Sequence, residues 1–383
     1  MADAIATARS FHERFRASSD ALEQSRRMPD ELARDMAAAG MFRLLVPKQH
    51  QGLEVHPQEF FDAIATTAQA DGAVGWCQMI GTTTGMMSAS LPEQWARTIY
   101  GEHPNTITTG VTAPIGTATR EGNDLRVSGR WPFGSGSQIS DWICGGCLIQ
   151  GEEGPELNDA GVPRALLVFF PAEAVTIHED SWRTSGLRGT GSNDIEVNNL
   201  LVPQGRWVEL GGRPLVDAPL YRFPTLGLLA LGVSAVAIGI ARHAISAFVD
   251  LATAKVPTGS GRTLAERAAV QKDLAQAEAL VQSAAALTRV AIETSWDIAS
   301  SGGRLSTDHK AQLRLAASNN AWSAAKAVDL VYHAAGGSAI YETSPLQRCF
   351  RDVHVATQHI MVAQPTYEVI GRVRLGMPAR SPL

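Results

Sequence analysis

Five ionisable side chains gather near the C-terminus, in a stretch that is otherwise largely apolar. They are Arg348, Arg351, Asp352, His354 and His359. A histidine near a carboxylate suits acid–base chemistry, because the imidazole pKa lies close to neutral pH. On one continuous helix Asp352 and His359 would share a face, whereas His354 and His359 would lie about 140° apart. The pattern therefore favours proton transfer over a metal site built from the two histidines.

These side chains need a helix to position them, and the sequence marks where that helix begins. Gly336-Gly337 end the preceding helix, since glycine readily adopts the left-handed conformation found after a helix C-terminus. Ser344-Pro345 begin the next one, with serine as N-cap and proline at the first helical position. We expect this helix to run to Gly371, with a kink or early end at Pro365.

The composition is that of an ordinary globular protein. The chain has 383 residues, 45% of them hydrophobic and 19% charged, with a formal net charge of −5. This length predicts about two or three packed units. The absence of a basic tract argues against a nucleic-acid partner. We expect no membrane span, because the most apolar stretch, 226–240, is shorter than the roughly 18 residues required. The chain start does not resemble a secretion signal, so we expect a cytoplasmic protein.

The four cysteines include one pair with the spacing of a redox or zinc motif. This pair is Cys144-Gly145-Gly146-Cys147, and it lies inside an apolar, strand-like run. No second pair or nearby pair of histidines completes a zinc site. We interpret these as buried strand cysteines and expect no metal.

Composition divides the chain into three parts. Residues 1–105 have helical patterns, and 106–215 consist of short β-rich runs separated by glycine. Residues 216–383 are helical again. The long helices expected there cover 226–254, 263–300, 307–335 and 345–371. The expected fold class is α+β, mostly α: an N-terminal helical domain, a central β-barrel or sandwich, and a C-terminal four-helix bundle.

Five short motifs occur in an order that resembles a known superfamily. They are Asp71–Trp76, Val111–Ala118 with its Thr112-Ala113-Pro114 core, Val127–Ser137, Gly186–Ser192 and Ala335–Asp352. With the order of the three parts, they make essentially the whole chain resemble the acyl-CoA dehydrogenase superfamily. The resemblance implies a flavin bound between the β domain and the bundle.

The chain departs from that superfamily where a dehydrogenase needs its base. Removal of the α-proton of a thioester requires a carboxylate. Where the resemblance places this residue, the chain has Ile360, preceded by His359, and the alternative position near 252–257 has no acid. Isoleucine cannot accept a proton. The chain is therefore more similar to the two-component flavin-dependent monooxygenase branch of the superfamily.

That branch implies a reduced-flavin-dependent monooxygenase, the oxygenase component of a two-component system. It would hydroxylate an aromatic, phenolic or polyketide-like small molecule through a flavin C4a-hydroperoxide, with molecular oxygen as co-substrate. Reduced FMN or FAD would come from a separate NAD(P)H:flavin reductase, because no GxGxxG sequence follows a strand and opens a helix in this chain. The resemblance also implies a homotetramer.

The resemblance assigns roles to individual residues. His359 would donate or stabilise the proton on the peroxide, and Ser135 or Ser137 would hydrogen-bond the flavin N5 edge. His354 or His103 would act as the base toward a phenol. A dry apolar pocket is needed to prevent loss of hydrogen peroxide, and Trp131 and Phe133 are expected to contribute to it. The residues expected to bind substrate are Trp76, Met79, Met86, His103, His354 and Arg188.

The residues expected to contact the cofactor are spread over several motifs. They are Thr112, Ala113, Pro114, Trp131, Phe133, Gly134, Arg262, Gly336, Gly337, Arg351 and Asp352. Trp131 would cover the flavin, and Arg262 is the nearest candidate for its pyrophosphate. Gly336-Gly337 would admit the flavin tail of a neighbouring subunit. Arg351-Asp352 would form an ion pair near the flavin or at a subunit contact.

Two other functions remain compatible with the sequence. The first is an acyl-CoA dehydrogenase with a displaced base, for which Glu266 or Asp250 would have to serve. The second is a non-catalytic relative that keeps the fold as a binding or scaffolding module and holds no flavin.

Overall fold

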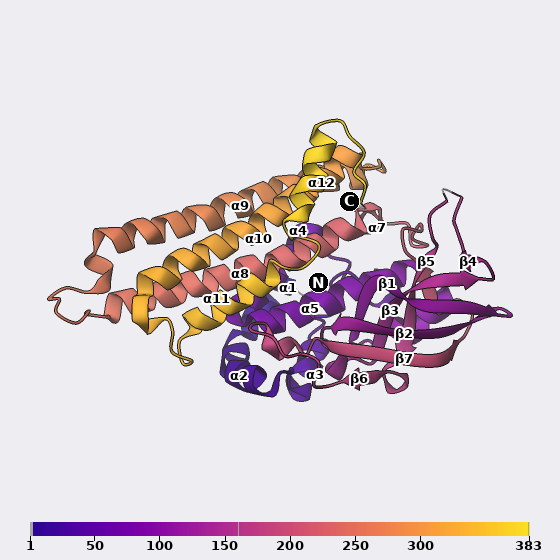
Figure 1. The fold of residues 1–383 in the computed structure, drawn as a ribbon, viewed down its shortest axis with the longest axis horizontal. Coiled ribbons are helices and arrows are strands. Elements are labelled where there is room, and N and C mark those ends of the chain that lie inside the picture. Colours follow the sequence, from indigo (N-terminus) through magenta and orange to yellow (C-terminus); the bar gives the residue numbers. More distant parts are fainter. Residues whose placement is uncertain (1–2, 160, 382) are drawn as a thin grey trace.

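The computed structural model of the chain describes residues 3–159, 161–381 and 383, and its elements follow the order helices, sheet, helices (Figure 1). The N-terminal helices are α1 (Ala4–Ser10), α2 (His12–Ser25), α3 (Asp30–Ala38), α4 (Pro57–Ala70), α5 (Gly72–Gly85) and α6 (Glu93–Ala96). Asp71 sets the start of α5, because its carboxylate accepts hydrogen bonds from the backbone N–H groups of Ala73 and Val74. The helix α5 is buried along nearly its whole length between the sheet and the bundle.

One sheet forms the middle of the chain. Its strands are β1 (Thr108–Glu121), β2 (Asp124–Gly134), β3 (Trp142–Gly151), β4 (Gly154–Pro155), β5 (Ala165–Pro171), β6 (Thr176–His178), β7 (Asn193–Val202) and β8 (Trp207–Glu209). They lie in the order β6-β7-β2-β1-β3-β5-β8, with β4 paired to β3. The pairings are antiparallel except between β1 and β3. That pairing shifts register between Val111 and Gly116, which leaves residues 112–115 as an exposed bulge.

Trp131 fills the interior of this sheet, contrary to the expectation that it covers a flavin. Its side chain has no exposed surface, and its Nε1 donates to the backbone oxygen of Gly146 at 2.7 Å. A Cβ on Gly145 would lie 2.6 Å from the indole, so glycine at this position makes room for the ring. The glycines between Cys144 and Cys147 therefore serve packing. Both cysteines are buried in β3, as the sequence predicted.

The C-terminal part is built around one long apolar helix. The helices are α7 (Pro219–Arg222), α8 (Thr225–Ala254), α9 (Ala268–Ser300), α10 (Thr307–Ala335), α11 (Pro345–Ala356) and α12 (Pro365–Arg374). The helix α8 packs against α4, α10 and α11. By length and composition alone α8 passes as a membrane span, but 83% of its most apolar window is buried inside the protein, as in the core helix of a soluble fold. The expected order of parts, with helices first, a β domain in the middle and a helical bundle at the C-terminus, is confirmed.

The predicted helix from Pro345 to Gly371 is wrong in its middle. It ends at Ala356, and residues 357–364 form successive turns before α12 begins at Pro365. Asp352 and His359 therefore do not share a helix face. Two bonds from α10 hold the turns: Trp322 Nε1 donates to the oxygen of Val362 at 3.0 Å, and Arg314 Nη2 donates to that of Met361 at 3.1 Å. We call residues 357–364 the connecting segment.

The space that Gly145 leaves for the Trp131 indole predicts how a larger residue at this position would affect stability. We expect Gly145→Ala to lower the free energy of unfolding by about 1–3 kcal/mol, because the added methyl group would overlap the indole. Gly371→Ala is the matched control, since a Cβ there meets nothing within 4 Å and the position is helical. Urea unfolding followed by circular dichroism measures both variants. Equal midpoints for Gly145→Ala and wild type would contradict the packing.

Candidate active site

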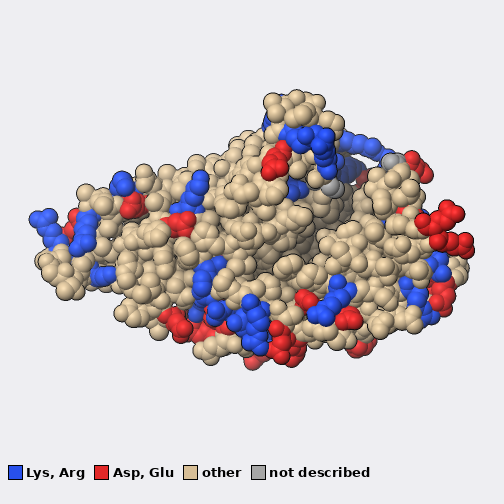
Figure 2. Space-filling view, viewed as in Figure 1, with Lys and Arg blue, Asp and Glu red and all other residues tan. Residues whose placement is uncertain are grey.

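A hollow separates the bundle from the sheet on one face of the molecule. Figure 2 shows this hollow between the α12 end of the bundle and the β domain, with mostly uncharged residues around it. The helix α5 passes between the bundle and β1 in this region (Figure 1). The groups that can take part in chemistry here come from α5, the end of β2, the turn after β6 and the connecting segment.

Three hydroxyl groups form a continuous buried chain that begins just after β2. Ser135 Oγ lies 2.6 Å from Ser192 Oγ, which lies 2.6 Å from Thr190 Oγ1. Thr190 Oγ1 donates to the backbone oxygen of Leu187 at 2.8 Å. On the other side, Trp76 Nε1 donates to Ser135 Oγ at 3.1 Å. All three hydroxyl residues are buried.

The single proton on each hydroxyl fixes the direction of this chain. Because Thr190 uses its proton on Leu187, it must accept from Ser192, and Ser192 must accept from Ser135. Ser135 therefore donates inward and cannot donate to a ligand while the chain is intact. Its oxygen, which already accepts from Trp76, keeps one lone pair for a further donor. Toward a ligand Ser135 is thus an acceptor.

His359 lies across Trp76 from Ser135. The two rings make an edge contact, with centroids 5.6 Å apart. His359 Nδ1 accepts the backbone N–H of Met361 at 3.3 Å, so a neutral ring carries its proton on Nε2. Desolvation, together with the smaller effect of the positive charge of Arg314, lowers the His359 pKa to about 4. At neutral pH His359 therefore offers an uncharged N–H donor rather than an imidazolium, although part of the residue still reaches the surface.

Near this group, the bulge of β1 and Phe133 present surface that suits a planar cofactor. Residues 112–115 are exposed, pair with no neighbouring strand across the register shift, and include the predicted Thr112-Ala113-Pro114. Phe133 on the adjacent strand is 66% exposed, whereas Gly134 after it is buried. The Oγ of Ser137 is buried without a partner. Exposed peptide groups, an exposed ring and an unused hydroxyl fit a flavin, which needs both stacking and hydrogen-bond partners.

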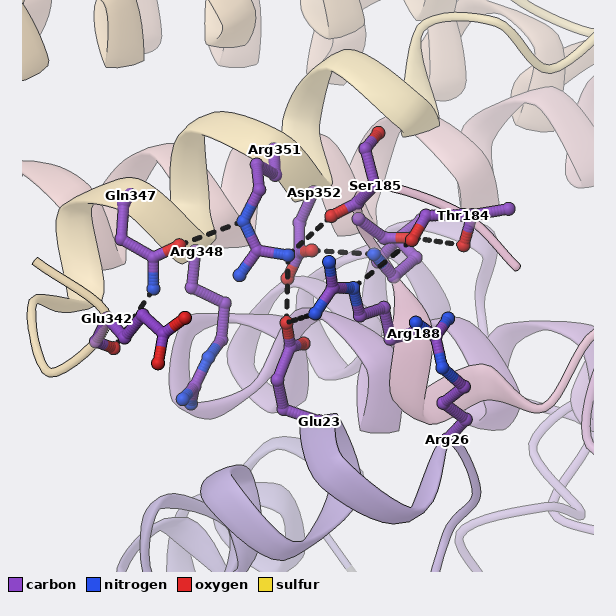
Figure 3. A network of polar contacts seen from close by, with 12 residues as sticks. Glu23, Arg26, Thr184, Ser185, Arg188, Glu342, Gln347, Arg348, Arg351 and Asp352 are labelled. Carbon is purple, nitrogen blue, oxygen red and sulfur yellow. Dashed lines mark hydrogen bonds and ion pairs between the residues drawn. The ribbon is translucent and has the colours of Figure 1, made fainter. Parts of the chain in front are cut away.

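Arg351 and Asp352 bind the protein itself. Arg351 forms an ion pair with Glu23 of α2 at 2.8 Å, and Asp352 accepts the N–H of Leu187 at 2.6 Å (Figure 3). Arg188, expected in the substrate pocket, instead pairs with the same Glu23 at 3.2 Å. These three residues tie the turn after β6 to α2 and α11. The expectation of an Arg351–Asp352 ion pair is wrong, since each has a different partner.

Several predicted site residues lie elsewhere. Met79 is fully buried beneath Gly232 of α8, and Met86 is buried in the same core, so both support the wall of the hollow. His103 is exposed on the loop before β1, and His354 binds Asp329 of α10 at 2.8 Å.

Arg262, Gly336 and Gly337 are exposed on loops that join the bundle helices at the end away from α12 (Figure 1). One chain does not bring them to the hollow.

Sequence reasoning missed three residues of this group. Thr190 and Ser192 lie in the glycine-rich motif 186–192, which was noted only for its resemblance. Two hydroxyl residues within a tight turn were an available signal. Arg314 was also missed, although a single arginine among the apolar and small residues 313–318 is unusual enough to notice.

The buried carboxyl of Asp352 predicts a pH effect on stability. Burial raises its pKa to about 7; the Leu187 hydrogen bond opposes the shift, and the charges of Asp71 and Glu23 add to it. Between the unfolded pKa and pH 7 the folded chain thus binds more protons than the unfolded chain, so stability falls as pH rises through this range. We expect Asp352→Asn to remove about 2 kcal/mol of the decline between pH 5 and pH 8. Urea unfolding at both pH values tests this, and the same decline in wild type and variant would contradict it.

The protonation state of His359 can be observed directly. We expect its ring to stay neutral, with the proton on Nε2, throughout pH 6–8, because the folded pKa is near 4. A pH titration of the histidine ¹⁵N signals measures this, and His359→Gln assigns the resonance. The lowered pKa also means that its contribution to stability is lost as pH falls from about 6.5 toward 4. Titration of the assigned signal near pH 6.5 would contradict the expectation.

Comparisons with known proteins agree with this geometry. The family described as acyl-CoA dehydrogenase, C-terminal domain, matches residues 231–364. Indole-3-acetate monooxygenase of Pseudomonas putida is 32% identical over 363 residues, which cover 95% of this chain and 91% of the relative. The crystal structure of 3-HSA hydroxylase from Rhodococcus sp. RHA1 superposes with a TM-score of 0.90 at 22% identity and covers 98% of both chains.

A further solved structure is that of XiaF from Streptomyces sp. in complex with FADH2 and glycerol. It has a TM-score of 0.90 at 22% identity and covers 99% of this chain and 96% of that one. At such identities the structures establish the fold, and the match along nearly the whole length of a monooxygenase establishes the family. The chain therefore belongs to the flavin-dependent monooxygenase branch of the acyl-CoA dehydrogenase superfamily.

Proposed function

We propose that this chain is the oxygenase component of a two-component system and hydroxylates an aromatic small molecule with reduced FMN or FAD. The observation that carries the proposal is that Trp76 contacts both Ser135 and His359, in a chain of this family. The electrons come from the reduced flavin. One atom of molecular oxygen enters the substrate, and the other leaves as water.

The flavin would be held by residues of the sheet. The exposed bulge Thr112-Ala113-Pro114 offers peptide groups, and Phe133 offers a ring to stack on. Reduced flavin, when bound, supplies the electrons that activate oxygen. The acceptor character of Ser135 suits a reduced flavin, because N5 of the reduced ring carries a hydrogen that an oxygen can accept. The unused hydroxyl of Ser137 is a second candidate partner.

His359 would donate a hydrogen bond to the reacting oxygen. A neutral ring with its proton on Nε2 can donate a hydrogen bond to a developing oxyanion and stabilise it as the oxygen–oxygen bond breaks, with the ring staying neutral. Trp76 stands between His359 and Ser135, so the hydrogen-bond donor and the N5 acceptor lie on either side of one buried indole. The uncharged surroundings of the hollow favour exclusion of water, which limits wasteful release of hydrogen peroxide.

The candidate bases of a dehydrogenase are badly positioned for that reaction. Glu266 accepts the N–H of Thr263 and caps the turn before α9. Asp250 is exposed near the C-terminal end of α8. Both lie at the end of the bundle away from α12, and Ile360 in the connecting segment is 75% exposed. This geometry favours the monooxygenase over the displaced-base dehydrogenase.

The proposal includes partners. Among the described residues no strand, glycine-rich turn and helix form a dinucleotide-binding unit, so a separate NAD(P)H:flavin reductase would supply the reduced flavin. We also propose a cytoplasmic homotetramer. In such an assembly the exposed Arg262 and Gly336-Gly337 would approach the flavin tail of a neighbouring subunit.

The test couples the purified chain to a flavin reductase with NADH and either FMN or FAD. Indole, indole-3-acetate and phenol are offered under ¹⁸O₂, and hydroxylated product and hydrogen peroxide are quantified. We expect one ¹⁸O atom per product molecule. Ser135→Ala should lower product per NADH about tenfold and raise hydrogen peroxide, because the N5 partner is lost.

Ser128→Ala is the matched control, since Ser128 lies on β2, the strand that leads into Ser135, and its hydroxyl accepts the N–H of Asn199 away from Trp76 and Ser192. This variant should couple like wild type. Oxidation of an acyl thioester with an artificial acceptor under anaerobic conditions, without any aromatic product in air, would overturn the proposal.

A further inference from the structure

Three arginines are buried among the described residues: Arg43, Arg206 and Arg314, which are 7%, 8% and 5% exposed. The Nε of all three lacks a hydrogen-bond partner, but in two of them the rest of the guanidinium has compensating contacts. Arg43 donates to three backbone carbonyl oxygens. The Arg206 guanidinium lies 5.4 Å and 5.7 Å from the ring centres of Trp95 and Trp142. Each of these charges is compensated by the protein itself.

Arg314 lacks such compensation. Its one hydrogen bond runs from Nη2 to the oxygen of Met361 at 3.1 Å, and its Nε is buried without a partner. Within the described ranges no carboxylate lies at ion-pair distance from it, and no aromatic ring lies over it. A buried guanidinium without a counter-charge is strongly unfavourable. The structure therefore keeps a desolvated positive charge that nothing in the chain neutralises.

The position of Arg314 connects this charge to the active site. It lies on α10 against the connecting segment, close enough to His359 for its charge to act on that ring. Ser318 follows one helical turn later on the same side of α10, and its hydroxyl is also buried without a partner. Two unpartnered polar groups thus neighbour each other on α10, and Arg314 reaches the connecting segment that contains His359. Because His359 is neutral, Arg314 supplies the positive charge there.

We propose that Arg314 binds an oxyanion, and that this oxyanion is the carboxylate of an aromatic substrate with an acidic side arm. A guanidinium offers parallel N–H donors that match both oxygens of a carboxylate. Ser318 would donate a further hydrogen bond, and the aromatic ring would lie beside His359 and Trp76. The inference rests on the proposed function and specifies its substrate class. The other source of the same oxyanion chemistry is the flavin, through its phosphate or its reduced ring.

Binding measurements separate these two sources. Isothermal titration of the flavin-free and the flavin-loaded protein uses indole-3-acetate and its neutral isostere indole-3-acetamide, and FMN and FAD are titrated separately. Wild type should prefer the acid over the amide. We expect Arg314→Gln to weaken binding of the acid about 10- to 100-fold while binding of the amide and of both flavins is unchanged. Arg314→Lys should recover part of the preference.

Arg206→Gln is the matched control, because it removes an equally buried arginine with an unpartnered Nε from the β domain. It should leave the preference for the acid intact. Arg314→Met should change the melting temperature little, because the loss of the bond to Met361 is offset by removal of an uncompensated buried charge. A lower melting temperature with equal loss of acid and amide binding would mean that Arg314 only holds the connecting segment, and would overturn the proposal.

Three other results would also overturn it: loss of flavin binding with an unchanged acid preference, equal affinity of wild type for acid and amide, and binding of neither. The proposed function can fail separately. If wild type prefers the acid but incorporates no ¹⁸O into any aromatic compound, the oxygenase proposal fails and the anion site remains. If wild type hydroxylates neutral indole but binds acid and amide equally, the anion-site proposal fails and the oxygenase proposal stands.

Discussion

The hydrogen bond from the N–H of Leu187 to Asp352 joins the bundle to the sheet, and the candidate site depends on it. The approach is very close: a Cβ on Gly186 would lie 2.4 Å from the backbone oxygen of Arg351, so only glycine lets the turn reach α11. Leu187 is held there at a φ of 48°, a conformation that an L-residue with a side chain adopts only when its surroundings impose it. The pairing of Glu23 with two arginines supports the same contact from α2.

The position of this turn decides the chemistry of the hydroxyl chain that starts from it. The oxygen of Leu187 receives the proton of Thr190, and this sets the donor direction up to Ser135. The backbone is tied in as well, because the N–H of Gly136 donates to the oxygen of Thr190 at 2.8 Å. A carboxyl on α11 thus determines, through one turn, that Ser135 presents an acceptor toward the hollow. The bonds are local, but their combined effect spans all three parts of the chain.

The sequence correctly predicted the helix boundaries that depend on a local pattern of residues. The helix expected at 307–335 is α10 to the residue, and the one expected at 226–254 differs from α8 by one residue, because long apolar patterns with clear end signals specify their own limits. The break after Ala356 was missed because no glycine or proline marks it before Pro365. Trp131 was misjudged for another reason: its slot is made by glycines on neighbouring strands. Likewise, the partners of Ser135 come from a turn more than fifty residues away, and no local signal carries such contacts.

The conformation of the connecting segment bears on which of two reactions, monooxygenation or thioester dehydrogenation, this fold can carry out. Adjacent side chains in a turn point in different directions, so residues 359 and 360 cannot both face Trp76. Trp322 and Arg314 bind the oxygens of Val362 and Met361, and these bonds fix which of the two faces Trp76. It is His359, and the Ile360 side of the turn faces solvent. A carboxylate at 360 would therefore be directed away from Trp76 unless the segment rotated, and rotation would break the bonds from α10. The same bonds keep Arg314 buried beside His359, so the choice of residue and the placement of positive charge are set together.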